Sequence, residues 1–408
     1  MPMDRRTFLL SGASAGVLFG LRPHVASAAG GGAIAGSAPA VAGDPRLVVV
    51  TLHGGNDALN TVVPIDDPAY AAARGALAVD PEAAHDLGDG YALHPALAGG
   101  KALWDAGQLA VVHGVGFPSL DRSHFHCMDV WQAGDEEELG TGWLGRWLDE
   151  VSDDPLDAVA VGRRLPLALR GSRRSAAVVP VGPFVLPGDD ALRRSITAIS
   201  RPERGRPPLA ALVASSTNDL LSVVDTVGPL VAPGPTMGAG DEEGGAAGGT
   251  ASADSGGLAG QLAVVADLIE ADVPTRVFGV ELGGFDTHAN QAGTHAALLT
   301  ELDGALASFV TRMGGRPVTV VVFSEFGRRV KTNGSAGTDH GGAGTVLLAG
   351  HVRPGSHGDP PPLDRLDGGD LATTVDFRSV YGGLLEGVLG VDAADVLAAA
   401  PRPLALVP

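Results

Sequence analysis

Aspartate and histidine residues lie close together at two points of the sequence, and each pair could bind a metal ion. Asp286 and His288 lie in a Phe-Asp-Thr-His stretch, and His340 follows Asp339 in a Thr-Asp-His-Gly-Gly stretch. Carboxylate oxygens and imidazole nitrogens are mixed ligands that hard and borderline divalent cations accept. The alternative is that these aspartates cap helices or loops and the histidines bond backbone carbonyls. We expect a divalent metal ion near Asp286, His288 and His340.

A third polar stretch, His-Gly-Gly-Asn-Asp at residues 53–57, follows an apolar run in the same way as the first two. If the three runs are strands of one parallel sheet, His53, Asn56 and Asp57 come to the same sheet edge as the two pairs. Such convergence makes a shared site more probable than any single pair does.

Ser123 precedes an apparent helix within the stretch Asp-Arg-Ser-His-Phe-His at residues 121–126. A hydroxyl at a helix N-terminus is placed for attack on a phosphorus or sulfur centre, because the free N–H groups and the helix dipole hold the anion. The alternative is an ordinary N-cap. Arg122, Arg328 and Arg329 could clamp an oxyanion, although arginines in loops are more often surface residues.

Strands and helices that could position these residues alternate along the chain. Four apolar runs end in glycine or polar residues and predict strands buried on both faces of a parallel sheet: 46–52, 109–113, 275–282 and 318–323. Three segments carry apolar residues at helical spacing: 258–269, 295–309 and 377–388. The alternation predicts an α/β layered sandwich with a mostly parallel central sheet, whose ligand sites lie at the carboxyl ends of its strands.

The composition limits the kinds of partner. The chain has 408 residues, 45% of them hydrophobic, and a formal net charge of −19. The hydrophobic fraction is enough for a substantial core and excludes global disorder. The negative charge repels nucleic acid and anionic lipid, so we expect neither as a partner. A single cysteine, Cys127, permits no internal disulfide and no cysteine-rich metal site.

The N-terminus has the features of an export signal. Arg5 and Arg6 precede a mildly apolar run to Leu21, and Ala-Ser-Ala at residues 26–28 is typical of a signal cleavage site. The paired arginines favour a twin-arginine signal at 1–28 over an ordinary secretory signal or a lipoprotein anchor. No other stretch has ~18 unbroken apolar residues, so we expect no transmembrane segment after signal removal. The predicted location is the periplasm, the cell envelope or the medium.

The mature part of the sequence predicts one large domain. Residues 29–44 are rich in Gly and Ala and predict a flexible lead-in, and residues 45–408 predict a single α/β domain. Residues 233–257 contain hardly any large apolar side chain and predict a low-complexity surface insertion.

Several short motifs occur together and in a fixed order along the chain. After the paired arginines they are His-Gly-Gly-Asn-Asp at 53–57, Arg-Ser-His-Phe at 122–125, Gly-Phe-Asp-Thr-His at 284–288, Ser-Glu-Phe-Gly-Arg at 324–328 and Gly-Thr-Asp-His-Gly at 337–341. This set resembles the exported bacterial domain-of-unknown-function-1501 family over nearly the whole mature chain. The resemblance implies an alkaline-phosphatase-like core, of the superfamily that includes phosphatases, sulfatases and cofactor-independent phosphoglycerate mutases. It implies no particular substrate.

The resemblance also implies roles for single residues. Asp57 would be the carboxylate after the first strand, and Ser123 the nucleophile. Glu325 stands where an Asp-His dipeptide is usual in the superfamily, and Phe326 replaces its histidine. The expected metal ligands are Asp57, Asp286, His288, Glu325 and His340, and the expected catalytic residues are Ser123, Arg122 and Arg328.

Two functions are open at this point. The first is an exported, metal-dependent hydrolase of phosphate or sulfate esters, acting on a small anionic ester. The second is a non-catalytic cell-envelope binding or assembly protein on the same scaffold, with an envelope protein as its partner. The grouped histidines and aspartates favour the first function, and Phe326 favours the second.

Overall fold

The computed structural model describes residues 43–118, 121–151, 154–186, 188–201, 203–231, 256–398 and 401–408. The export signal predicted at 1–28, nearly all of the predicted lead-in and most of the predicted insertion lie outside these residues. Gly257, the last residue of the predicted insertion, is the first residue of helix α9 (Gly257–Glu270).

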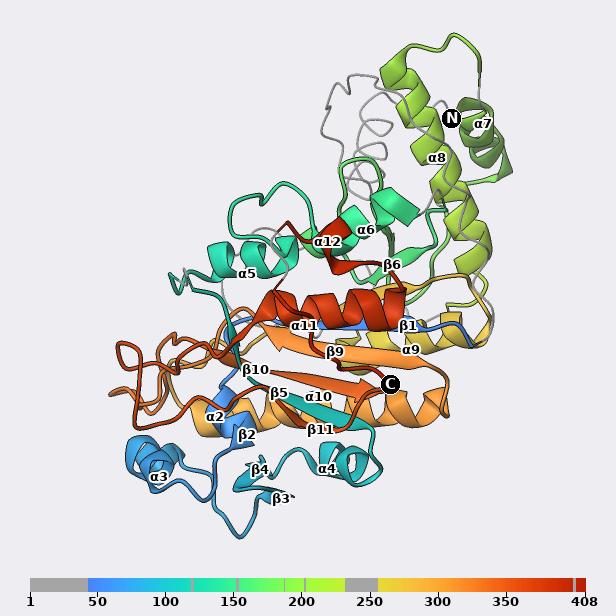
Figure 1. The fold of residues 1–408 in the computed structure, drawn as a ribbon. Coiled ribbons are helices and arrows are strands. Elements are labelled where there is room, and N and C mark those ends of the chain that lie inside the picture. Colours follow the sequence, from blue (N-terminus) through green and yellow to red (C-terminus); the bar gives the residue numbers. More distant parts are fainter. Residues whose placement is uncertain are drawn as a thin grey trace.

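A mostly parallel sheet forms the centre of the described structure (Figure 1). Strand β1 (Arg46–Leu52) lies between β8 (Val277–Leu282) and β9 (Val318–Ser324) and is parallel to both. The sheet order is β11-β5-β10-β9-β1-β8-β6-β7, and β12 also pairs with β5. The outer strands are β5 (Leu109–Gly116), β6 (Ala158–Val161), β7 (Ala177–Val179), β10 (Gly344–Gly350), β11 (Gly355–His357) and β12 (Val375–Asp376).

Apolar residues cover both faces of this sheet because alternate side chains of each strand point to opposite sides. On β1, Val48 and Val50 belong to one buried core, whereas Leu47 and Val49 belong to the other. The first core is shared with α4 (Ala98–Asp105), α9 and α10 (Gln291–Met313), and the second with α5 (His124–Ala133), α6 (Trp143–Val151) and α11 (Phe377–Leu384). The predicted α/β layered sandwich is therefore confirmed.

The four predicted strands are all present, as β1, β5, β8 and β9. The sequence did not indicate β10, which is antiparallel to both β9 and β5 and lies between them. Its apolar centre, Val346 to Ala349, lies between glycines and threonine, so it gave no long β-branched run.

Smaller elements surround the sheet. A three-stranded antiparallel sheet is formed by β2 (Val62–Val63), β4 (Tyr91–Leu93) and β3 (His85–Gly88). The short helices α2 (Ala58–Thr61), α3 (Pro68–Arg74) and α12 (Ala393–Val396) and the longer α7 (Asp190–Ser200) and α8 (Pro208–Val227) complete the layout. Among the described residues, no helix is both long and apolar enough to cross a membrane.

Candidate metal centre

The loops that follow the three central strands meet at one edge of the sheet. Because β1, β8 and β9 are adjacent and parallel, residues 53–57, 283–288 and 325–328 all leave the sheet at its carboxyl edge. Gly54 allows two of these loops to touch: a Cβ atom there would lie 2.4 Å from the backbone nitrogen of Asp286, and the φ of Gly54 is +119°. Helix α5 begins at the same edge and brings His124 to it.

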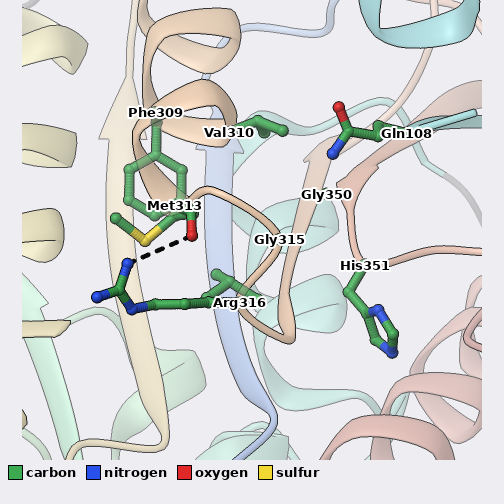
Figure 2. Close-up of a pocket in the computed structure, with 9 residues that line it drawn as sticks. Gln108, Phe309, Val310, Met313, Gly315, Arg316, Gly350 and His351 are labelled. Atoms are coloured by element: carbon green, nitrogen blue, oxygen red, sulfur yellow. Dashed lines mark hydrogen bonds between the residues drawn. The ribbon is translucent and has the colours of Figure 1, made fainter. Parts of the chain in front are cut away.

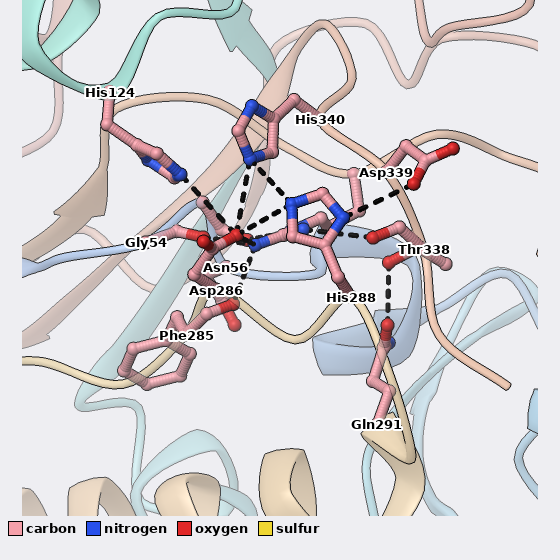
Figure 3. A network of polar contacts seen from close by, with 12 residues as sticks. Gly54, Asn56, His124, Phe285, Asp286, His288, Gln291, Thr338, Asp339 and His340 are labelled. Carbon is pink, nitrogen blue, oxygen red and sulfur yellow. Dashed lines mark hydrogen bonds and ion pairs between the residues drawn. The ribbon is translucent and has the colours of Figure 1, made fainter. Parts of the chain in front are cut away.

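Three histidines and one aspartate converge at this edge (Figure 3). The Asp286 Oδ1 atom lies 3.4 Å from His124 Nε2, 3.0 Å from His288 Nε2 and 3.2 Å from His340 Nε2. The Nε2 atoms of His288 and His340 are 2.9 Å apart. The sequence placed Asp286, His288 and His340 together, and the structure brings these three side chains into contact and adds His124.

The other ring nitrogen of each histidine faces an acceptor. Nδ1 of His124 lies 2.7 Å from Glu325 Oε1, Nδ1 of His340 lies 2.9 Å from the Arg122 carbonyl, and Nδ1 of His288 lies 3.2 Å from Asp339 Oδ1. An ionised carboxylate or a carbonyl can only accept a hydrogen bond, so Nδ1 carries the proton in each neutral ring. All three Nε2 atoms are then left with a lone pair directed at the same region.

Lone pairs that face one another and a carboxylate oxygen repel unless a cation lies between them. His124 Nε2 is buried and has no hydrogen-bond partner among the described residues. Ligand atoms about 2.1 Å from a metal, at angles of 90–110°, lie about 3.0–3.4 Å from one another. The distances from Asp286 Oδ1 to the three Nε2 atoms lie within that range, and the 2.9 Å between the Nε2 atoms of His288 and His340 is just below it. The fixed Nδ1 partners are the arrangement that orients histidine ligands in metal sites.

The cluster is half open to solvent, which leaves room for a further ligand. The side chains of His340 and His124 are 22% and 29% exposed, and those of His288 and Asp286 are 43% and 49% exposed. His124, Asp286 and His340 form a triad whose ligand atoms all lie within 4.8 Å of one another, and His288 extends it to a fourth member. The residues present therefore fit a nitrogen- and oxygen-coordinated divalent ion.

Charge in the cluster is set by its immediate neighbours. Burial raises the pKa of Asp286, but the hydrogen bonds from Arg328 and His340 and the charges of Arg328 and His124 together outweigh burial and lower the pKa to about 2. The hydrogen bond to Glu325 raises the pKa of His124, whereas burial lowers that of His340. Asp286 is therefore an anion at any ordinary working pH, as a metal ligand must be.

Arg328 holds the strand-end loops together and does not face the solvent. Its guanidinium donates to the carbonyls of Gly55 at 2.7 Å, Thr338 at 2.9 Å and Phe285 at 2.9 Å, to the carbonyl of Gly54, and to Asp286 Oδ1 at 2.7 Å. The side chain is fully buried. With its N–H groups taken up in this way, we infer that Arg328 positions the site and does not clamp an oxyanion.

Asp57 lies away from the cluster, in a buried ion pair. Its two oxygens accept hydrogen bonds from Arg74 at 2.5 and 2.7 Å, and Gln291 donates to it as well. Burial raises the pKa of Asp57, but the charges of Arg74 and His295 and the hydrogen bonds from Arg74 and Gln291 together outweigh burial, and the net shift is downward. Because its oxygens are used in this way, we leave Asp57 out of the proposed ligand set.

Glu325, His53 and Asn56 also have partners other than a metal. Glu325 is buried and accepts from Gly54 N, His124 Nδ1 and Ser324 Oγ, so it orients a ligand histidine. Nε2 of His53 lies 3.2 Å from Glu281, and Asn56 bonds Thr61 and His295.

Ser123 and Arg122 lie beside the cluster. Ser123 is the N-cap of α5, where its hydroxyl accepts weakly from His126 N at 3.4 Å. Arg122 has a φ of +62°, a strained conformation for a residue with a side chain, and its carbonyl bonds His340 in this conformation. Its guanidinium pairs with the buried Asp370, which also lies 3.6 Å from Arg329 Nε.

Phe326 covers one side of the cluster. Its ring centroid lies 4.9 Å from that of His124 and 4.9 Å from that of His340. Gly55 makes room for it, because a Cβ atom at that position would lie 2.3 Å from the Phe326 ring.

Two contributors to the site were missed from the sequence, namely His124 as a ligand and Asp339 as the partner of His288. The signal for His124 was its position directly after the N-cap of a helix that starts at the functional sheet edge.

A cavity at the opposite sheet edge offers no comparable chemistry. It has a volume of about 70 Å³ and lies near the start of β9 and the end of β10, with Arg316, Met313 and His351 among its lining residues (Figure 2). Arg316 donates to the Met313 carbonyl at 3.4 Å, and the cavity contains no group of histidines and carboxylates.

The fold and the site define an α/β layered sandwich with a histidine- and aspartate-rich centre at the carboxyl ends of its central strands. The chain belongs to the family described as Protein of unknown function (DUF1501), whose model matches residues 104–375. This segment contains all four residues of the cluster. No curated protein matches the chain. One solved structure with similarity to it is the C-terminal periplasmic domain of EcEptC from Escherichia coli in complex with Zn, with 10% identity, a TM-score of 0.36, and coverage of 78% of this chain and 77% of that one.

Proposed function

We propose that this protein is a metal-dependent hydrolase of phosphate or sulfate esters, with the metal bound by His124, His288, His340 and Asp286. The observation that carries the proposal is the convergence of three acceptor Nε2 atoms on one aspartate oxygen, each with its Nδ1 atom held by an acceptor. The motifs resemble the domain-of-unknown-function-1501 family, and that resemblance implies an alkaline-phosphatase-like core, which supports a phosphate or sulfate ester as the substrate. Membership of the alkaline-phosphatase-like superfamily is part of the proposal.

The residues around the metal centre have different proposed roles. A bound divalent ion would supply Lewis acidity toward an ester oxygen. Glu325, Asp339 and the Arg122 carbonyl hold the ligand rings, and Arg328 holds the loops. The guanidinium groups of Arg122 and Arg329 are both partly exposed and fixed by Asp370, so they can attract an anionic substrate in a chain that is otherwise strongly acidic.

Metal-loaded protein should hydrolyse an aryl phosphate or an aryl sulfate, and His351→Ala should hydrolyse it equally well. His351 is an exposed histidine at the far edge of the sheet, so its loss controls for removal of an imidazole. Metal-loaded protein that turns over neither ester would contradict the proposed function.

Ser123 is the nucleophile that we propose, and its capping role can be separated from its chemistry. Ser123→Ala should abolish turnover and lower the free energy of unfolding by about 1 kcal/mol, because a helix cap is lost. Ser123→Asn should abolish turnover as well but keep the stability, since asparagine caps helices as well as serine does. Both variants should retain bound metal. Normal turnover by Ser123→Asn would assign the attack to a group other than Ser123.

A non-catalytic cell-envelope binding or assembly protein is the second candidate. The observation that favours it is Phe326, whose ring lies against His124 and His340 and closes one side of the cluster. A binding protein would retain metal and show no turnover of either ester, and its stability would respond to chelator like that of an enzyme. The ester assay therefore decides between the two candidates.

Export by the twin-arginine pathway is also part of the proposal. Because a receptor reads the paired arginines, changing Arg5 and Arg6 together to lysine should retain the precursor in the cytoplasm. The mature N-terminus of the wild type should be Ala29, which N-terminal sequencing of exported protein would establish. Export of the double variant at the normal rate would refute the twin-arginine assignment.

A further inference from the structure

The α7–α8 hairpin carries a basic and apolar surface on an otherwise acidic protein. Between residues 191 and 213 the chain has five arginines and one glutamate, although its net charge is −19. Figure 1 shows α7 and the first half of α8 standing away from the sheet, with their connection at the end farthest from it. The second half of α8 anchors the hairpin, because Val223, Val224 and Val227 are buried in the core that contains α9 and α10.

The outer half of α8 is apolar but uncovered. Every residue of the Pro-Pro-Leu-Ala-Ala-Leu-Val stretch at 207–213 is exposed. Leu209 is 65% exposed, and Ile199 at the end of α7 is 56% exposed. Grouped aliphatic side chains that remain in water mark a surface that meets a partner.

Five arginines precede this apolar stretch, in α7 and in the connection to α8. Arg194, Arg201 and Arg204 are exposed and form no ion pair with a described residue, whereas Arg193 pairs with Asp225 and Arg206 with Glu203. Exposed leucines next to unpaired arginines suit a surface that is negatively charged at its boundary and apolar just beneath, which is the structure of an anionic lipid bilayer. An acidic protein surface would pair with the arginines but would offer the leucines no apolar region to enter.

We propose that the hairpin tip, residues 194–201 and 203–213, docks the protein on the surface of a membrane that contains anionic phospholipid. Leu209, Leu212 and Ile199 enter the interfacial layer, and the three arginines contact phosphate groups. The acidic remainder of the protein does not prevent this, because charges more than about 10 Å from the lipid are screened at physiological salt. The net charge indicated no membrane-surface binding, and the local arrangement reverses that expectation.

Co-sedimentation of the full mature chain with vesicles tests the proposal. The wild type should bind vesicles of phosphatidylcholine containing about one third phosphatidylglycerol, should not bind pure phosphatidylcholine, and should be released by salt. Replacing Arg194, Arg201 and Arg204 together by glutamate should weaken binding on the order of a hundredfold. Leu209→Ser with Leu212→Ser should also weaken it. All these side chains are exposed, so the melting temperature should stay unchanged.

A matched control makes the same change in net charge at residues outside the hairpin. Lys331, Arg365 and Arg402 are exposed outside the hairpin, and their joint replacement by glutamate should leave vesicle binding close to that of the wild type. Equal loss in both triple variants would overturn the proposal, as would equal binding to both lipid compositions. A wild type that binds neither kind of vesicle would also overturn the proposal and would indicate an acidic protein as the partner of the hairpin tip. Vesicle binding requires neither metal nor turnover, so this result stands apart from the proposed hydrolase activity.

Discussion

His340→Ala is expected to lose its bound metal and to become insensitive to chelator. The replacement removes one of the three Nε2 atoms that face Asp286, and with it the contacts to His288 and to the Arg122 carbonyl. Changes to groups that merely orient a ligand already cost roughly 10–100-fold in metal affinity, so loss of a ligand should cost more than that. Metal analysis after dialysis, together with melting curves with and without chelator, measures both effects.

The wild type should melt at a lower temperature in chelator, because a ligand that binds only the folded state stabilises it. A free metal concentration of a hundred times the dissociation constant adds about 2.7 kcal/mol to the free energy of unfolding. His351→Ala should respond to chelator like the wild type. Glu325→Gln should keep the metal with an affinity reduced roughly 10–100-fold, because it weakens the orientation of His124 without removing a ligand. A His340→Ala variant that still responds to chelator would contradict the ligand assignment.

Arg74→Met is expected to lower the free energy of unfolding by about 3–5 kcal/mol. Asp57 would remain buried with its carboxylate facing no cation, and an unpaired buried charge costs that amount. The double variant Asp57→Asn with Arg74→Met should recover part of the loss, since both charges are then absent. Chemical denaturation of the three proteins measures the differences.

The same variants test the place of Asp57 in the site. If Asp57 serves only as the counter-ion of Arg74, Asp57→Asn should keep the metal and lose stability. The pKa of Asp57 is lowered on folding. The ion pair therefore adds to the free energy of unfolding at a pH above the ordinary pKa of aspartate, and this stabilisation is lost as the pH falls below that pKa. Loss of metal from Asp57→Asn at unchanged stability would instead make Asp57 a ligand, as the resemblance implied.

The sequence predicted the central strands because they are almost entirely buried. β1 and β9 are buried along their whole length and β8 at every residue except Glu281. Strands covered on both faces carry apolar runs, and such runs are readable without any tertiary information. β10 lies beside them yet carries the weaker pattern of a strand bounded by glycines. Its antiparallel direction depends on the path of the preceding loop, which a local pattern does not encode.

The site could be predicted in part for a related reason. Asp286, His288 and His340 were recognisable because they lie close to strand ends. The roles of Asp57 and Arg328 depend on burial and on partners that are distant in the sequence: Arg328 bonds Gly54 and Phe285, more than forty residues away. Arg74 lies in a helix that gave no functional signal. Residue type and spacing therefore indicated the chemistry, while tertiary packing decided which charged groups remain free for it.

X-ray absorption at the metal edge of protein purified from its native compartment is the most direct test of the central claim. We predict one metal per chain with only nitrogen and oxygen ligands, at about 2.0–2.2 Å if the ion is zinc, and with the scattering pattern of at least two imidazoles. His340→Ala should show no such signal. Protein that carries no stoichiometric metal, and whose melting curve is unmoved by chelator, would contradict the metal centre and the hydrolase proposed from it.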